Sequence, residues 1–192
     1  TNENSLKWME KKNWIYEKTF NVSKEFLKYT KKSLVFDGVD TFAEIYLNDI
    51  LLGKTENMFH PYIYDTLNIL KNKNTIKIKF LSPSVYLKNL ENKNKIVMRG
   101  PFDTARGYGR KAQYHFGWDW GPRFPSSGLW RDVYILGIDD AKIEWIFVKQ
   151  KEICKSLAVM EINVEIDSVI RGDIEFEIIL KDGRKMRKEI FS

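Results

Sequence analysis

Apolar and polar residues alternate with a period of two over much of this chain, and this alternation constrains the fold more than any other feature. In the run TIKIKF (75–80), Ile76 and Ile78 are separated by lysines. The run FAEIYLN (42–48) interleaves apolar and polar residues in the same manner. Because successive side chains of a β-strand point to opposite faces, both runs predict strands with one buried and one solvated face.

Turn residues separate the predicted strands at short intervals. The run SLVFDGVD (33–40) predicts a strand that ends in a turn at Asp37-Gly38. The run NDILLG (48–53) predicts a hairpin connection at Asn48-Asp49, followed by a return strand. Short strands joined by such turns are typical of an antiparallel β-sandwich, so the chain is predicted to be all-β.

Two runs have helical spacing instead. Residues 22–32 have Ser23 as a candidate N-cap, and residues 82–95 have Ser82 as a candidate N-cap with Pro83 in the first turn. We expect a short helix in each run. Neither run is long enough to define a helical domain.

The alternation stops between residues 99 and 130. This stretch carries six glycines and three prolines, so we expect a long connection with at most one short strand, KAQYHF (111–116). Long connections inside compact domains are usually functional or disordered. The aromatic residues of this stretch favour an ordered, functional segment.

Period-two alternation resumes at residues 130–138, which we predict to be the last strand of a first domain covering 1–139. Three further strand segments follow in residues 140–192, the last with a hairpin turn at Asp182-Gly183. About 50 residues make only half of an immunoglobulin-like sandwich of about 100 residues. The second domain, 140–192, is therefore predicted to be partial.

Composition excludes several classes of protein. No apolar run approaches the roughly 18–20 residues of a membrane span, and the polar start of the chain predicts no secretory leader. A single cysteine, Cys154, and two histidines predict no internal disulfide and no metal site, and favour a reducing, cytoplasmic location. We also expect no cofactor. We expect Cys154 to be buried or half-buried. The net charge of +6 is scattered, which argues against a nucleic-acid partner.

The segment YHFGWDW (114–120) is the strongest candidate for a binding site. It carries four aromatic residues, with Asp119 between Trp118 and Trp120. An indole face packs against the C–H patches of a sugar ring, and a carboxylate accepts hydrogen bonds from adjacent hydroxyls. The alternatives are tryptophans in a core and an aspartate that stabilises a turn. His115 is expected to be a hydrogen-bonded structural residue.

Two stretches resemble the β-mannosidases of glycoside hydrolase family 2. They are LVFDGVDTFAEIYLNDILLGKTENMFHPYIYD (34–65) and RKAQYHFGWDWGPRFPSSGLWRDV (110–133). The resemblance implies a galactose-binding-like jelly-roll β-sandwich followed by a truncated immunoglobulin-like β-sandwich. It also implies a catalytic (β/α)8 barrel that is missing from this chain. By the same comparison, we expect the family's opening strand to be absent.

The resemblance further implies roles for the aromatic segment. In similar enzymes this segment reaches the mouth of the barrel and completes the pocket for the terminal mannose of a β-mannoside substrate. Carried over to this chain, Asp119 would hydrogen-bond to mannose hydroxyls and Trp118 would form a wall of the pocket. Trp120 is expected to pack beneath the loop.

The chain itself lacks the residues of a retaining glycosidase, which needs two carboxylates about 5–5.5 Å apart. The dipeptide Asn2-Glu3 is the nearest match to the family's acid/base motif, and it follows no predicted strand. We therefore predict no catalytic residue and no activity for this chain alone. The alternative function is an independent, lectin-like carbohydrate-binding module without hydrolase activity; a nucleic-acid binder is the second alternative.

Overall fold

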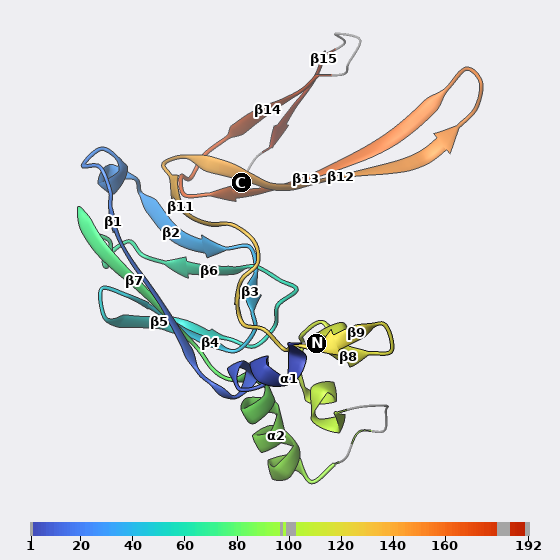
Figure 1. Ribbon diagram of the computed structural model, residues 1–192. Helices are drawn as coiled ribbons and strands as arrows, with labels where there is room; N and C mark the ends of the chain where they lie inside the picture. Colours follow the sequence, from blue (N-terminus) through green and yellow to red (C-terminus); the bar gives the residue numbers. More distant parts are fainter. Residues whose placement is uncertain (1, 97, 99–102, 180–184, 191–192) are drawn as a thin grey trace. The chain divides into compact units, whose positions relative to one another are not determined.

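The computed structural model describes residues 2–96, 98, 103–179 and 185–190 (Figure 1). Strands dominate the described residues, as the sequence predicts. The strands are β1 (Trp14–Asn21), β2 (Lys31–Phe36), β3 (Val39–Asp40), β4 (Ala43–Leu47), β5 (Ile50–Thr55), β6 (Tyr62–Asp65), β7 (Lys73–Phe80), β8 (Phe116–Trp118), β9 (Gly121–Arg123), β10 (Gly128–Leu129), β11 (Val133–Ile138), β12 (Ala141–Ile153), β13 (Ala158–Ser168), β14 (Ile174–Ile179) and β15 (Lys185–Ile190). The helices are α1 (Glu3–Leu6) and α2 (Pro83–Asn94), with the 3-10 turns η1 (Met9–Lys11), η2 (Phe26–Lys28), η3 (Thr104–Tyr108) and η4 (Gln113–His115).

The chain divides into two compact units. The first comprises Thr1–Lys28 and Lys32–Gly137, and the second comprises Tyr29–Lys31 and Ile138–Ser192. A helix that is long and apolar enough to cross a membrane does not occur among the described residues.

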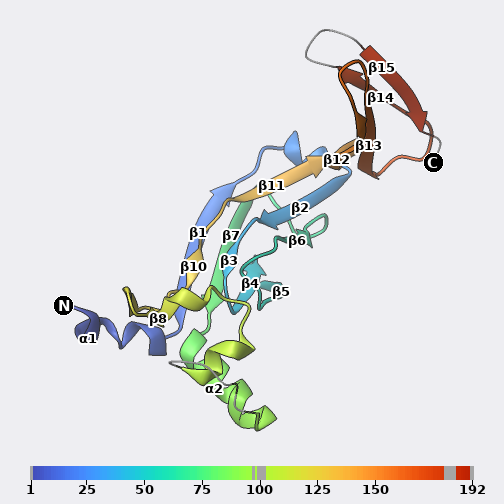
Figure 2. The same ribbon diagram turned by 90° about the vertical axis from the view of Figure 1, so that its right-hand side faces the viewer.

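The first unit is a β-sandwich. One antiparallel sheet has the strand order β1-β7-β4-β5, and a second has the order β11-β2-β6 (Figures 1 and 2). The core between them contains Phe36 from β2, Ile45 from β4, and Ile78 and Phe80 from β7, all almost completely buried. The period-two prediction for residues 42–48 and 75–80 is therefore confirmed.

The predicted hairpin at Asn48-Asp49 is also confirmed. These two residues connect β4 to β5 with φ angles of 51° and 65°. Positive φ at both central residues is the requirement of a type I′ turn, whose twist matches that of the flanking strands. The predicted turn at Asp37-Gly38 separates β2 from β3, and the absence of a Cβ at Gly38 lets the indole of Trp130 pack against the backbone.

Of the two predicted helices, one is confirmed and one is wrong. Residues 83–94 form α2, and the Ser82 hydroxyl accepts the Val85 amide at 3.1 Å. Residues 22–32 form only the turn η2, because β2 begins at Lys31. The Lys32 carbonyl accepts a hydrogen bond from the Thr66 amide at 2.8 Å. The backbone at the end of this run is therefore paired next to the sheet and does not form helical hydrogen bonds.

The strand predicted at residues 111–116 is wrong as well. Gln113–His115 form the turn η4, and β8 begins at Phe116. Ala112 and Phe116 are buried while Tyr114, midway between them, is 63% exposed. In a strand these three side chains would share a face, whereas a spacing of four places buried residues on one side of a helical turn.

The described residues of the second unit form two antiparallel strand pairs, β12–β13 and β14–β15. The predicted turn at Asp182-Gly183 lies outside the described residues. Cys154 is exposed, contrary to expectation. It lies in the tight turn between β12 and β13, where its amide donates to the Leu157 carbonyl at 2.8 Å and its side chain has no packed layer to enter.

Candidate functional site

The aromatic segment forms a small hairpin at one end of the sandwich (Figure 1). In this aromatic hairpin, β8 pairs with β9 through Phe116 opposite Arg123 and Trp118 opposite Gly121. Asp119 and Trp120 therefore make a two-residue turn at the tip. Gly117 has a φ of 96°, a conformation that favours glycine, and so allows the sharp entry into the hairpin.

The tip residues point away from the hydrophobic core. Trp118 is 37% exposed, Trp120 is 78% exposed and Asp119 is exposed. The two indole rings lie 5.4 Å apart between centroids, at an interplanar angle of 51°. The expectation that Trp120 packs beneath the loop is wrong, because the turn places it at the outermost point of the hairpin. The structure thus brings all three predicted residues together on one exposed tip.

A hollow of about 570 Å³ lies beside this tip. Its walls come from the aromatic hairpin and from the start of the chain. They include Trp118, Asp119 and Trp120 on one side and Asn2, Glu3 and Leu6 on the other. Glu3 of α1 therefore lines the same hollow as Asp119. Sequence reasoning missed this neighbour because α1 is separated from the hairpin by more than 100 residues.

Arg123 attaches the aromatic hairpin to its surroundings. Its Nε donates to Glu10 Oε2 at 3.0 Å, and its Nη2 donates to Ser84 Oγ at 3.1 Å. The same nitrogen lies 3.1 Å from Asp103 Oδ2. The guanidinium also lies over the Phe116 ring, 5.4 Å from its centroid. One side chain in β9 thus connects the hairpin to three separate segments.

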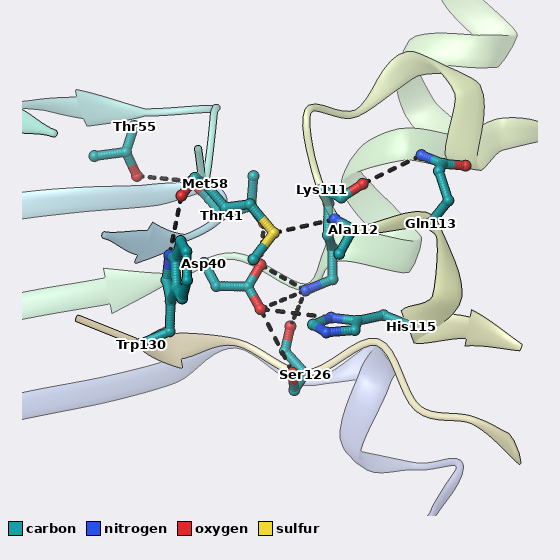
Figure 3. Close-up of polar contacts among 10 residues, drawn as sticks. All are labelled: Asp40, Thr41, Thr55, Met58, Lys111, Ala112, Gln113, His115, Ser126 and Trp130. Carbon is teal, nitrogen blue, oxygen red and sulfur yellow. Dashed lines mark hydrogen bonds and ion pairs between the residues drawn. The ribbon is translucent and has the colours of Figure 1, made fainter. Parts of the chain in front are cut away.

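A buried polar cluster lies at the base of the hairpin (Figure 3). The Lys111 side chain is 0% exposed, and its ammonium donates to Asp40 Oδ1 and Oδ2, each at 2.6 Å. It also donates to the Ser126 carbonyl at 2.7 Å. Burial lowers the pKa of Lys111, and the adjacent Asp40 carboxylate only partly opposes this effect.

His115 borders this cluster. Its Nδ1 lies 3.7 Å from Asp40 Oδ2 and has no hydrogen-bond partner within the described part of the chain. Burial lowers the pKa of His115, and the Lys111 charge lowers it further, while Asp40 acts in the opposite direction. The hydrogen bond expected for His115 is therefore not found at Nδ1 among the described residues, and the ring lies beside the Lys111–Asp40 pair instead.

The tip carries chemical groups that suit the binding of a ligand. The exposed tip offers two indole faces and one carboxylate, a combination that suits a ring with C–H patches and hydroxyl groups. Groups of three or more His, Cys, Asp or Glu side chains that could hold a metal ion do not occur in residues 2–96, 98, 103–179 and 185–190.

Comparisons with known proteins agree with the fold. A family model described as "Glycosyl hydrolase 2 galactose-binding domain-like" matches residues 1–131. Beta-mannosidase from Mus musculus is 35% identical over 153 residues, which cover 76% of this chain and 17% of that protein. Beta-mannosidase B from Thermothelomyces thermophilus is 31% identical over a match 198 residues long, gaps included, that covers 98% of this chain and 22% of that protein.

A solved structure extends the comparison. The beta-D-mannosidase from Dictyoglomus thermophilum matches with a TM-score of 0.93 and 36% identity, over 98% of this chain and 24% of that one. The chain therefore spans between 17% and 24% of the length of these relatives. The predicted all-β, galactose-binding-like class and the resemblance to β-mannosidases of glycoside hydrolase family 2 are confirmed. The chain belongs to the glycosyl hydrolase 2 galactose-binding domain-like family, and its relatives among known sequences and solved structures include beta-mannosidases.

Proposed function

We propose that this chain is the non-catalytic N-terminal part of a retaining, exo-acting β-mannosidase that removes terminal β-D-mannose residues. Residues 1–139 would form the galactose-binding-like domain and residues 140–192 part of an immunoglobulin-like sandwich. The aromatic hairpin would complete the substrate pocket of a (β/α)8 barrel that lies outside this chain. The observation that carries the proposal is the exposed placement of Trp118, Asp119 and Trp120 on one tip.

Each tip residue has a physical part in this proposal. The Asp119 carboxylate accepts hydrogen bonds from two neighbouring hydroxyls of the mannose, away from the bond that is cleaved. Trp118 provides an apolar wall for the sugar ring, and Trp120 adds a second indole surface at the rim. Contacts remote from the reacting bond position the sugar and contribute to transition-state binding without supplying the catalytic groups.

The substitution Asp119→Ala in the full-length enzyme tests the proposal. Loss of a charge-assisted hydrogen bond costs about 1.5–3 kcal/mol, so kcat/KM for a β-mannoside should fall roughly ten- to 150-fold. The thermal unfolding midpoint should stay unchanged because the side chain is exposed. Asp173→Ala, at another exposed aspartate, is the matched control and should leave kcat/KM unaltered. Unchanged kinetics for Asp119→Ala would reject the assignment.

The alternative function is an independent lectin-like module, and the exposed aromatic tip gives it a specific basis. Isothermal titration calorimetry of the 192-residue chain with mannose or mannobiose separates the two functions. We expect no saturable binding and no hydrolysis by this chain alone, because the proposed pocket needs barrel residues. Saturable binding that is lost in Asp119→Ala would favour the lectin-like module instead.

A further inference from the structure

The aromatic hairpin belongs to a segment whose two ends meet on one buried ammonium. The segment begins at Lys111 and ends at Ser126, and the Lys111 Nζ donates to the Ser126 carbonyl at 2.7 Å. Two further bonds of 2.6 Å join the same nitrogen to Asp40 (Figure 3). An ammonium has three protons, and here each one has an acceptor. We name Lys111, Asp40 and the Ser126 carbonyl the buried clasp.

The buried clasp also joins the segment to the sandwich. Asp40 is the last residue of β3, and β3 pairs with β10, where Asp40 lies opposite Gly128. The Ser126 hydroxyl lies 3.5 Å from Asp40 Oδ2. On the other side, the Ala112 amide lies 3.0 Å from Met58 Sδ, and the Met58 carbonyl accepts the Trp130 indole N–H at 2.9 Å (Figure 3). Both ends of the segment are thus held on the same part of the first unit.

The charge of this pair needs a reason other than stability. Burying an ammonium and a carboxylate removes both from water, and an apolar pair of similar volume is often at least as stabilising. A charged pair does differ from an apolar one in geometry, because three short bonds with fixed directions define where the connected segments lie. The main effect of such a contact is therefore to fix the position of the connected segments, and its contribution to the free energy of folding is secondary.

We propose that Lys111 is a positioning residue, which fixes through the buried clasp the reach and orientation of Trp118, Asp119 and Trp120. Lys111 itself is too deeply buried to touch a ligand and acts only through the hairpin. Arg123 holds the same hairpin on another side. Its guanidinium contacts Glu10 of η1, Ser84 of α2 and Asp103. The consequence for substrate turnover rests on the proposed function, whereas the positioning of the hairpin does not.

The main test uses Lys111→Met combined with Asp40→Asn. The double variant removes the ion pair without leaving a buried carboxylate that has no counter-charge. Lys54→Met is the matched control, since Lys54 forms an exposed ion pair with Glu44 at 2.8 Å. Where the double variant does not fold, Lys111→Gln combined with Asp40→Asn replaces the ion pair by a neutral pair that can still hydrogen-bond, and the same changes are expected with smaller size.

The first measurement is amide hydrogen exchange of the 192-residue chain. In the double variant, residues 116–123 should exchange roughly tenfold faster or more, while β4 and β7 keep their protection. The control should match the unmodified chain throughout. Unchanged exchange in residues 116–123 would overturn the proposal, whatever the kinetics show.

The second measurement is kcat/KM of the full-length enzyme on an aryl β-mannoside. Displacement of a positioning group by about 1 Å can cost up to about 100-fold, so a loss of roughly ten- to 100-fold is expected. The loss should be smaller in an Asp119→Ala background, because both changes act through the same tip. Full activity of the double variant, together with reduced activity of Asp119→Ala, would overturn the positioning role. Full activity of both, with faster exchange, would instead reject the proposed function and leave the clasp supported.

Discussion

His115 is a titratable residue whose pKa is shifted by its surroundings. It lies beside the Lys111–Asp40 pair, and the Tyr114 ring meets it edge-on at 4.7 Å between centroids. Its pKa lies below the ordinary value of 6.5, first because of burial and second because of the Lys111 charge. The native state therefore binds this proton less readily than the unfolded state, so protonation favours unfolding.

A pH dependence of stability follows. The contribution of neutral His115 is fully present above pH 6.5 and is lost as the pH falls through the lower native pKa. We expect the free energy of unfolding, measured with urea, to decrease between about pH 7.5 and about pH 5, and His115→Gln to reduce that slope. His60→Gln is the control, because His60 is exposed. An unaltered slope in His115→Gln would show that other groups cause the dependence.

At the scale of residues, the sequence predicts the residues of the tip but not the long-range contacts that hold the hairpin in place. Trp118, Asp119 and Trp120 lie within three positions, so their combined chemistry is visible in the sequence. Lys111 and Asp40 are 71 residues apart, and Arg123 is 113 residues from Glu10. In the sequence alone, a lysine that is buried in the fold cannot be distinguished from a lysine that is solvated. The pairing of β3 with β10 and the contacts of Met58 with Arg110 and Ala112 bring the members of the clasp together.

At the scale of elements, α2 depends on its first turn. Ser82 accepts the Val85 amide, and its hydroxyl donates to the Glu10 carbonyl, so one buried side chain caps the helix and connects it to η1. We expect Ser82→Ala to lower the free energy of unfolding by about 1–2 kcal/mol, measured by urea denaturation. Ser82→Gly should cost less, since glycine is tolerated at N-caps. Equal losses in both variants would mean that packing, and not capping, explains the effect.

The strand predictions were correct for strands that have one buried face. Residues 42–48 and 75–80 have a buried face in the sandwich, so burial and sequence share a period of two. Residues 22–32 carry apolar side chains at helical spacing, yet backbone pairing of Lys31–Phe36 with β6 prevails over this local preference. A run of 11 residues is marginal as a helix without an apolar partner surface.

At the scale of the whole chain, the two units differ in how much apolar surface each covers. In the first unit, the inward-facing side chains of β4 and β7 are almost fully buried. In the second unit, β12 is exposed along nearly all of its length, with Trp145 and Phe147 each about half exposed. An isolated two-stranded hairpin is marginally stable in water, so a ladder such as β12–β13 opens at low cost.

We expect this difference to appear in amide hydrogen exchange of the 192-residue chain. Protection in β4 and β7 should exceed protection in β12 and β13 by roughly 100-fold or more, because exchange of core strands requires global unfolding. The measurement should be repeated at several protein concentrations, since exposed apolar strands can pair between copies and gain protection. In the full-length enzyme, β12 and β13 should become more protected and β4 should change little. Equal protection of both units in the dilute chain would contradict this account, because it would mean that the exposed apolar residues of β12 are already covered.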